Sequence, residues 1–219
     1  MDFTRDDRLL RRKIWKMLLP CMLYSAAMEI GNILDNFFAG SFLGVNAIAY
    51  PIDVCDYSQM EAMYKKAIEE WGRVDFVVNS AGVCLTEELT KQSLKDINLS
   101  IDVNIKGTVY SCREALKIMR PQKYGKIVNM SSIAAKSCAG GFSVYSATKA
   151  AVLALTASLG REAALDNVNV NCICPGDVDT PLVAQQLAQG HYTKEEMAAV
   201  YPLGRIGRPE EIAAVIAFL

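Results

Sequence analysis

The chain has 219 residues, enough for one domain of ordinary size, and its 52% hydrophobic and 21% charged residues exclude a disordered protein. A net charge of −1 and an isoelectric point near 5.9 give no reason to expect nucleic acid as a partner, because that partner selects a basic surface. The seven cysteines are scattered, without a CxxC pair or a histidine cluster. No metal site is therefore predicted, and a reducing compartment, the cytoplasm, is favoured.

Residues 1–48 differ in character from the rest of the chain. A charged start is followed by residues 17–49, which carry only Glu29 and Asp35 as charges. We expect a hydrophobic helix over about residues 17–39, long enough to span a membrane. The two acids oppose insertion, because an acid at the centre of the bilayer costs about 2.5–3.5 kcal/mol. Membrane contact through residues 14–49 stays an alternative to a cytoplasmic protein.

From residue 49 to residue 219, strand patterns alternate with amphipathic helix patterns. Gly72 is expected to end the first helix and Pro121 the second. The alternation predicts βαβ units and a parallel sheet, the α/β class of fold. The predicted strands are 48–54, 74–79, 125–130 and 168–174, and the predicted helices are 57–71, 93–119, 144–164 and 209 onward.

Tyr145 and Lys149 give the strongest chemical signal, because residues four apart share one face of a helix. An ammonium about 5 Å from a phenolate, at an effective dielectric of ~20, contributes roughly 3 kcal/mol and would bring a phenol pKa near 10 down to roughly 7–8. Such a phenol can exchange a proton with an alcohol or a ketone. Ser132 ends a predicted strand, and its hydroxyl can hold the substrate oxygen. A Tyr–Lys pair on the surface is the alternative, because YxxxK is common by chance.

Six further segments follow one another in the order typical of the short-chain dehydrogenase/reductase family, which the chain resembles over about residues 49–219. These segments are Asp53-Val54, Asn79-Ser-Ala-Gly82, Val103-Asn104-Ile-Lys-Gly107, Asn129-Met-Ser-Ser132, Pro175-Gly176-Asp-Val178-Asp-Thr180 and Tyr201–Ile212. One departure is Ser80, which stands where the family's NNAG motif has its second asparagine.

The resemblance implies catalytic roles for four residues. Tyr145 would be the general acid or base, and Lys149 would lower its pKa and hold the nicotinamide ribose. Ser132 would orient the substrate carbonyl, and Asn104 would position a water that links Lys149 to solvent. A hydride would then pass between the nicotinamide and a secondary alcohol or ketone, with no metal required.

The resemblance also implies NAD or NADP as cofactor, a small-molecule substrate, and a homo-oligomer formed through the helices at 93–119 and 144–164. Residues 183–201 correspond to the family's substrate lid. The residues implied in cofactor binding are Asp53, Val54, Asn79, Ala81, Gly82, Tyr145, Lys149, Pro175, Gly176, Val178 and Thr180.

A glycine-rich turn for the cofactor pyrophosphate is not found. The segment Ala39–Asn46 has Gly40 and Gly44, but it runs straight into Asp53 and is rejected as a phosphate loop. We therefore expect an incomplete Rossmann-like, doubly wound parallel sheet that lacks the first two strands and follows a hydrophobic helical segment. Residues 13–50 resemble the first transmembrane helix of MATE-type multidrug transporters, so a chimera shortened at both ends is predicted.

Weak or absent activity is expected of such a chain, and its alternatives are a membrane-associated transporter fragment or a catalytically silent remnant. His191 is interpreted as an ordinary loop residue. Cys172 and Cys174 are interpreted as core residues on opposite faces of a strand that cannot share a metal.

Overall fold

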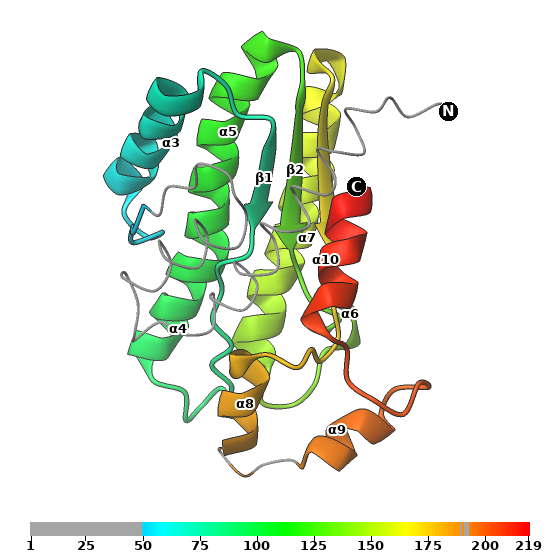
Figure 1. Cartoon of the computed structure of the whole chain (residues 1–219). Helices are drawn as coiled ribbons and strands as arrows, with labels where there is room; N and C mark the ends of the chain where they lie inside the picture. The colour runs from blue at the N-terminus through cyan, green and yellow to red at the C-terminus, as the bar shows by residue number, and fades with distance from the viewer. Residues whose placement is uncertain (1–49, 189, 191–192) are drawn as a thin grey trace. The chain divides into compact units, whose positions relative to one another are not determined.

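The computed structural model describes residues 50–188, 190 and 193–219 of the chain (Figure 1). These residues fall into two compact units, of which one is Ile52–Pro175 and the other contains Gly176–Leu219. The predicted hydrophobic helix, the transporter-like residues before Tyr50, the Ala39–Asn46 segment and His191 lie outside the described residues.

Three parallel strands form the sheet of the first unit, in the order β1 (Phe76–Asn79), β2 (Gly125–Met130) and β3 (Val168–Ile173). The register places Asn79 opposite Asn129, and Asn129 opposite Cys172. β1 and β2 run in the same direction, as Figure 1 shows. The parallel sheet confirms the predicted α/β, Rossmann-like class, and the strands predicted at 125–130 and 168–174 are confirmed to within one residue.

The helix α3 (Tyr57–Trp71) has the predicted bounds. Its N-cap is Asp56, whose carboxylate accepts hydrogen bonds from the amides of Ser58 and Gln59 at 2.8 and 3.3 Å. Gly72 ends the helix in the left-handed conformation, with φ 72°, which a residue without a Cβ adopts at no steric cost. Local sequence signals therefore define both ends of this element.

The strand predicted at residues 48–54 is wrong in its described part, because residues 50–54 form no strand. Asp53 starts a turn instead: its carboxylate accepts from the amide of Cys55 at 2.9 Å, and its carbonyl accepts from the amide of Asp56 at 3.0 Å. Ile52 and Val54 still pack against the hydrophobic core. The apolar run thus buries its side chains without the strand that its pattern suggested.

The long helix predicted at 93–119 contains a π-helical interruption. It consists of α4 (Leu94–Ile101), the π-helical segment η1 (Asp102–Gly107) and α5 (Thr108–Gln122). Pro121 lies inside the last turn of α5 and does not end it, so that expectation is wrong. The helix ends where Lys123 takes the left-handed conformation, with φ 53°.

The helix α7 (Ser143–Ala163) confirms the prediction for 144–164 to within one residue. No helix in the described ranges is both long and apolar enough to cross a membrane. The other elements are α6 (Ala134–Ser137), η2 (Ala164–Asp166), α8 (Pro181–Ala188), α9 (Lys194–Ala199) and α10 (Pro209–Phe218).

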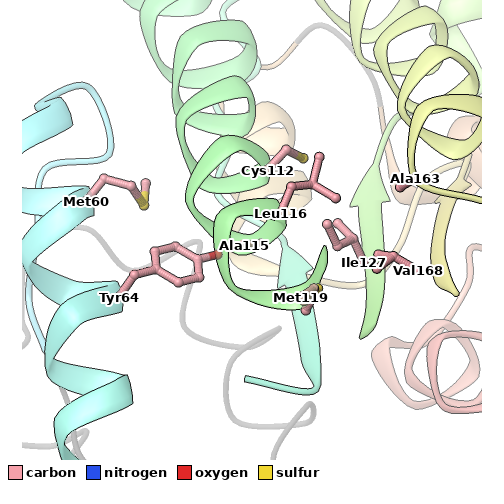
Figure 2. Packing of buried hydrophobic residues seen from close by; sticks show 9 residues of the cluster. All are labelled: Met60, Tyr64, Cys112, Ala115, Leu116, Met119, Ile127, Ala163 and Val168. Atoms are coloured by element: carbon pink, nitrogen blue, oxygen red, sulfur yellow. The ribbon is translucent and has the colours of Figure 1, made fainter. Parts of the chain in front are cut away.

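The core of the first unit lies between α3, α5 and the sheet (Figure 2). Met119 of α5 and Ile127 of β2 are fully buried, and Tyr64 of α3 is 5% exposed. The Tyr64 hydroxyl shares a 2.8 Å hydrogen bond with Ser111, so its polar end is satisfied inside the core. Full burial of each large apolar side chain stabilises the fold by about 1.5–3 kcal/mol.

Gly125, the first residue of β2, carries a steric prediction. A Cβ at this position would lie 2.4 Å from Met119 Sδ and 2.7 Å from Met119 Cβ, so Gly125→Ala must displace a fully buried side chain. We expect a loss of about 1–3 kcal/mol in the free energy of unfolding, measured by urea titration. Gly140→Ala is the control, because nothing lies within 4 Å of its Cβ position. Equal stability of the two variants would contradict this packing.

Candidate active site

The carboxyl end of β2 is joined to α7 by two hydrogen bonds. Ser131, which follows the strand, donates from its hydroxyl to the carbonyl oxygen of Lys149 at 2.7 Å. Lys149 donates from Nζ to the carbonyl oxygen of Met130 at 3.1 Å. Ser132 comes next, and its hydroxyl accepts from the amide of Ala134 at 3.1 Å as the chain turns into α6. The predicted serine thus lies directly beside the strand end that holds the predicted lysine.

Tyr145 and Lys149 lie one turn apart on α7, as their spacing predicted. Lys149 Nζ lies 5.7 Å from the centroid of the Tyr145 ring, within range of a cation–π interaction. Phe142 packs edge-on against the same ring, with the centroids 6.2 Å apart. Lys149 is only 6% exposed, and this burial lowers its pKa from the usual 10.5. The structure therefore brings the phenol and the amine together in a mostly dry environment.

Asn104 lies in the π-helical segment and links two parts of the first unit. Its Oδ1 accepts from the amide of Val83 at 2.8 Å, and its Nδ2 donates to the carbonyl of Val83 at 2.9 Å. Nδ2 also donates to the hydroxyl of Thr148 at 3.0 Å, next to Lys149 in the chain. Asn104 is 1% exposed, so these bonds satisfy a buried amide. The water link to Lys149 stays a prediction.

Gly82 passes between Asn104 and Lys149. A Cβ on this residue would lie 3.2 Å from Lys149 Nζ and 3.3 Å from Asn104 Oδ1. Asn79, earlier in the same segment, donates from Nδ2 to Asn129 Oδ1 at 2.8 Å, and Asn129 donates to the hydroxyl of Thr156 at 2.9 Å. The segment Asn79–Gly82 is therefore held by its asparagine to the sheet and brought close to Lys149 by its glycine.

Asp53 and Val54 lie before α3 and against η1. The amide of Asp53 donates to the side chain of Gln59 at 2.9 Å, and a Cβ on Gly107 would lie 3.1 Å from Val54 Cγ2. These contacts fix the turn that carries both residues. The part that the family resemblance implies for them in cofactor binding stays a prediction, as do the cofactor contacts of Ala81 and Pro175.

The loop Gly176–Thr180 belongs to the second unit and is held there by Tyr201. The Tyr201 hydroxyl accepts from the amide of Asp177 at 2.7 Å and donates to its carboxylate at 2.9 Å. A Cβ on Gly176 would lie 2.6 Å from the Tyr201 oxygen, so only glycine admits this close ring. Sequence reasoning placed Tyr201 at the start of a family motif and gave it no role, because nothing in the motif indicates what the ring touches.

A second strip of backbone supports the same loop. Val178 forms a parallel bridge with Gly207, the amide of Gly207 donates to the carbonyl of Asp177 at 2.8 Å, and the amide of Asp179 donates back to Gly207 at 2.9 Å. Thr180, implied in cofactor binding by the family resemblance, donates from its hydroxyl to the carbonyl of Val178 at 3.1 Å. Its role toward a cofactor stays a prediction, as does that of Val178. Among the described residues no group of three or more His, Cys, Asp or Glu could hold a metal ion.

Comparisons with known proteins show the family of the chain. Residues 39–219 match a family model described as enoyl-(acyl carrier protein) reductase. The chain is 34% identical over 170 residues to the 3-oxoacyl-[acyl-carrier-protein] reductase FabG of Thermotoga maritima, covering 78% of this chain and 68% of that protein. It is 38% identical over 205 residues to the oxidoreductase UcpA of Escherichia coli, covering 90% of this chain and 76% of UcpA. The chain belongs to the short-chain dehydrogenase/reductase family.

Solved structures show the same fold. ElxO with NADP bound has a TM-score of 0.78 and 31% sequence identity, over 84% of this chain and 75% of that one. An NAD⁺-bound xylitol dehydrogenase has a TM-score of 0.81 over 94% of this chain and 86% of that one, and at 22% identity it speaks for the fold alone. The predicted family and the Rossmann-like fold are confirmed.

The comparisons give no support to the transporter resemblance. The family match begins at residue 39, inside the segment predicted to be transporter-like. The match to UcpA covers 90% of the chain, a share that the residues after 49 cannot supply alone. The division of the chain at residue 48 stays a prediction.

Because Lys149 is buried, its charged amine is expected to lower the free energy of unfolding. Desolvation penalises the charged amine, so the penalty is present below the lowered pKa and fades as the pH rises toward 10.5. Lys149→Met is therefore expected to raise the free energy of unfolding at neutral pH, with an advantage over the native chain that shrinks at alkaline pH. Urea titration at both pH values measures this. Lys95→Met, at an exposed position on α4, is the control and should change little. A less stable Lys149→Met chain at neutral pH would show that the amine's contacts outweigh its burial.

The Tyr201 hydroxyl carries a second prediction. Tyr201→Phe removes both bonds to Asp177, and the loss of about 1–2 kcal/mol of local stability should speed exchange of the Asp177 amide about 5- to 30-fold. Residue-resolved hydrogen exchange measures it. Tyr124→Phe, on a side chain that is 37% exposed, is the matched control. An unchanged Asp177 rate would mean that Tyr201 does not hold the loop.

Proposed function

We propose that this chain is an NAD(P)-dependent oxidoreductase that transfers a hydride between the nicotinamide and a secondary alcohol or ketone. The observation that carries the proposal is the Tyr145–Lys149 pair, with Lys149 Nζ 5.7 Å from the phenol ring and bonded to the end of β2 beside Ser132. Membership of the family and the NADP-bound ElxO structure support the cofactor class.

The residues of the first unit fit a nicotinamide nucleotide. An ammonium has three donors, and the carbonyl of Met130 takes one from Lys149, so others remain for ribose hydroxyls. Gly82 leaves open the space over Lys149 that a Cβ would fill. When bound, the cofactor supplies or accepts the hydride, and the chain's own residues handle the proton and the substrate oxygen.

In the direction of reduction, Tyr145 donates its proton to the substrate oxygen. Lys149 favours the phenolate that is left, because a positive charge near a phenolate stabilises it. The Ser132 hydroxyl donates a hydrogen bond to the same oxygen and so fixes its position. In the direction of oxidation each step is reversed, with Tyr145 as the base.

Weak activity remains part of the proposal. It rests on the absence from the sequence of a recognisable glycine-rich turn for the pyrophosphate, whose contacts at a helix N-terminus supply much of the affinity for a dinucleotide. No observation on the described residues favours the transporter fragment over the oxidoreductase. A homo-oligomer, a substrate lid and a cytoplasmic location are carried as proposals from the family resemblance.

A titration with NADH and NADPH, followed by nucleotide fluorescence, tests the proposal on the native chain and on Tyr145→Phe. We expect saturable binding by both, because the ring and Lys149 remain. A tyrosine-to-phenylalanine variant of ElxO has been seen with NADPH bound, at 30% identity to this chain and a TM-score of 0.78. Reduction of a panel of ketones should fall about 10²–10⁴-fold in Tyr145→Phe, since that is the range for loss of a general acid.

Tyr124→Phe is the control and should keep both binding and turnover. Undiminished ketone reduction by Tyr145→Phe would overturn the assignment of the acid. Failure of the native chain to bind either nucleotide at millimolar concentration would leave a catalytically silent relative of the family, and ordinary turnover would contradict the expected weakness.

A further inference from the structure

Cys172 and Cys174 lie on the same face of the sheet, and the interpretation that they face opposite ways is wrong. The amide of Ser131 donates to the carbonyl of Ile173 at 2.9 Å, and the amide of Ile133 donates to that of Pro175 at 2.9 Å, so extended pairing continues past the end of β3. In an extended chain, neighbours alternate and residues two apart share a face.

The two thiols are also close to each other. Burial and, after it, the neighbouring Cys174 thiol raise the pKa of the Cys172 thiol. Neither residue is closed off from solvent, because both are only half-buried. We therefore expect a small reagent to reach both cysteines.

The shared face is the one that α7 covers. Cys172 stands opposite Asn129 in the register, and the side chain of Asn129 bonds to Thr156 on α7. Cys172 interacts with Thr156 as well, and it lies within electrostatic range of Lys149. A group attached to this thiol pair would lie under the helix that carries Tyr145.

The spacing favours a bridged pair over a disulfide. Residues two apart in a strand are separated by about 6.6 Å, and their Cβ atoms on one face by a similar distance. A disulfide needs Cβ atoms about 3.5–4.5 Å apart, so an S–S bond between Cys172 and Cys174 would force the strand to buckle. A third atom bonded to both sulfurs spans a longer gap and leaves the strand extended.

We propose that Cys172 and Cys174 form a dithiol site that captures trivalent arsenicals of the type R–As=O. Each sulfur forms one As–S bond, the As=O bond is lost, and the two thiol protons leave with that oxygen as water. Arsenic stays trivalent, so the step needs no oxidant and no reductant. The site does not depend on the proposed oxidoreductase activity, although the adduct would lie beside its residues.

Phenylarsine oxide added to the full chain tests the site. Intact-mass analysis should find one phenylarsenic group gained and two hydrogens lost, with release by a dithiol and not by the same concentration of a monothiol. Cys172→Ser and Cys174→Ser should each weaken the apparent affinity about 10²–10⁴-fold, because one sulfur then holds the arsenic alone. Cys138→Ser, at an exposed cysteine outside the pair, is the control and should bind as the native chain does.

A second measurement uses the native chain, so its result does not depend on whether the serine variants fold. Trypsin releases residues 162–194 as one peptide, whose only cysteines are Cys172 and Cys174. With the arsenical bound, an alkylating reagent should label the other accessible cysteines and spare this peptide. Labelling of the peptide would overturn the proposal, as would an adduct that survives in both serine variants or is lost in Cys138→Ser.

Oxidation tests whether the extended strand keeps Cys172 and Cys174 too far apart for a disulfide. A thiol oxidant such as diamide should leave Cys172 and Cys174 unjoined, because the extended strand holds their Cβ atoms too far apart. A ready Cys172–Cys174 disulfide would show that the strand bends easily and would remove the argument for a bridging atom.

Discussion

The site of this protein depends on the reciprocal pair of hydrogen bonds between the end of β2 and α7. The hydroxyl of Ser131 reaches the carbonyl of Lys149, and Nζ of Lys149 reaches the carbonyl of Met130. Together they fix where α7 lies along the strand, and so where the phenol of Tyr145 stands relative to Ser132. A site with a tolerance of about 0.5 Å needs such support, because a loop alone does not hold side chains that closely.

A row of buried amides strengthens this arrangement. Asn79, Asn129 and Thr156 form a chain of hydrogen bonds from β1 through β2 to α7, and Asn129 is fully buried. Each buried polar group costs free energy unless it is paired, so a shift of the strands by one residue would leave several amides without partners. The network thus selects one register. Asn104 fixes the position of the segment Asn79–Gly82 in a similar way, because its amide nitrogen and its amide oxygen both form hydrogen bonds with the backbone of Val83, the next residue.

The sequence predicted the features that depend on residues close together in the chain and missed those that depend on distant residues. Helix α3 was predicted to the residue, because its amphipathic pattern and Gly72 are local signals. The π-helical segment around Asn104 was not predicted, since no local pattern marks it and its side-chain bonds reach Val83 and Thr148, far along the chain. The strand at residues 48–54 failed because an apolar run indicates burial and leaves the pairing open. The same holds for Tyr201, whose partner Asp177 lies 24 residues away.

The costly features of the first unit collect where the chemistry is proposed. Lys149 is a buried amine, Gly82 gives up a side chain, and η1 replaces regular helix. Each of these features lowers stability in isolation, and each serves the proposed site in a different way. The charge of Lys149 acts on the phenol, Gly82 leaves space for a ligand, and the wider turn of η1 lets Asn104 reach its partners. The apolar core between α3, α5 and the sheet contains none of these compromises. Because the two regions share β2, stability gained in the core can hold the site end of the strand in place.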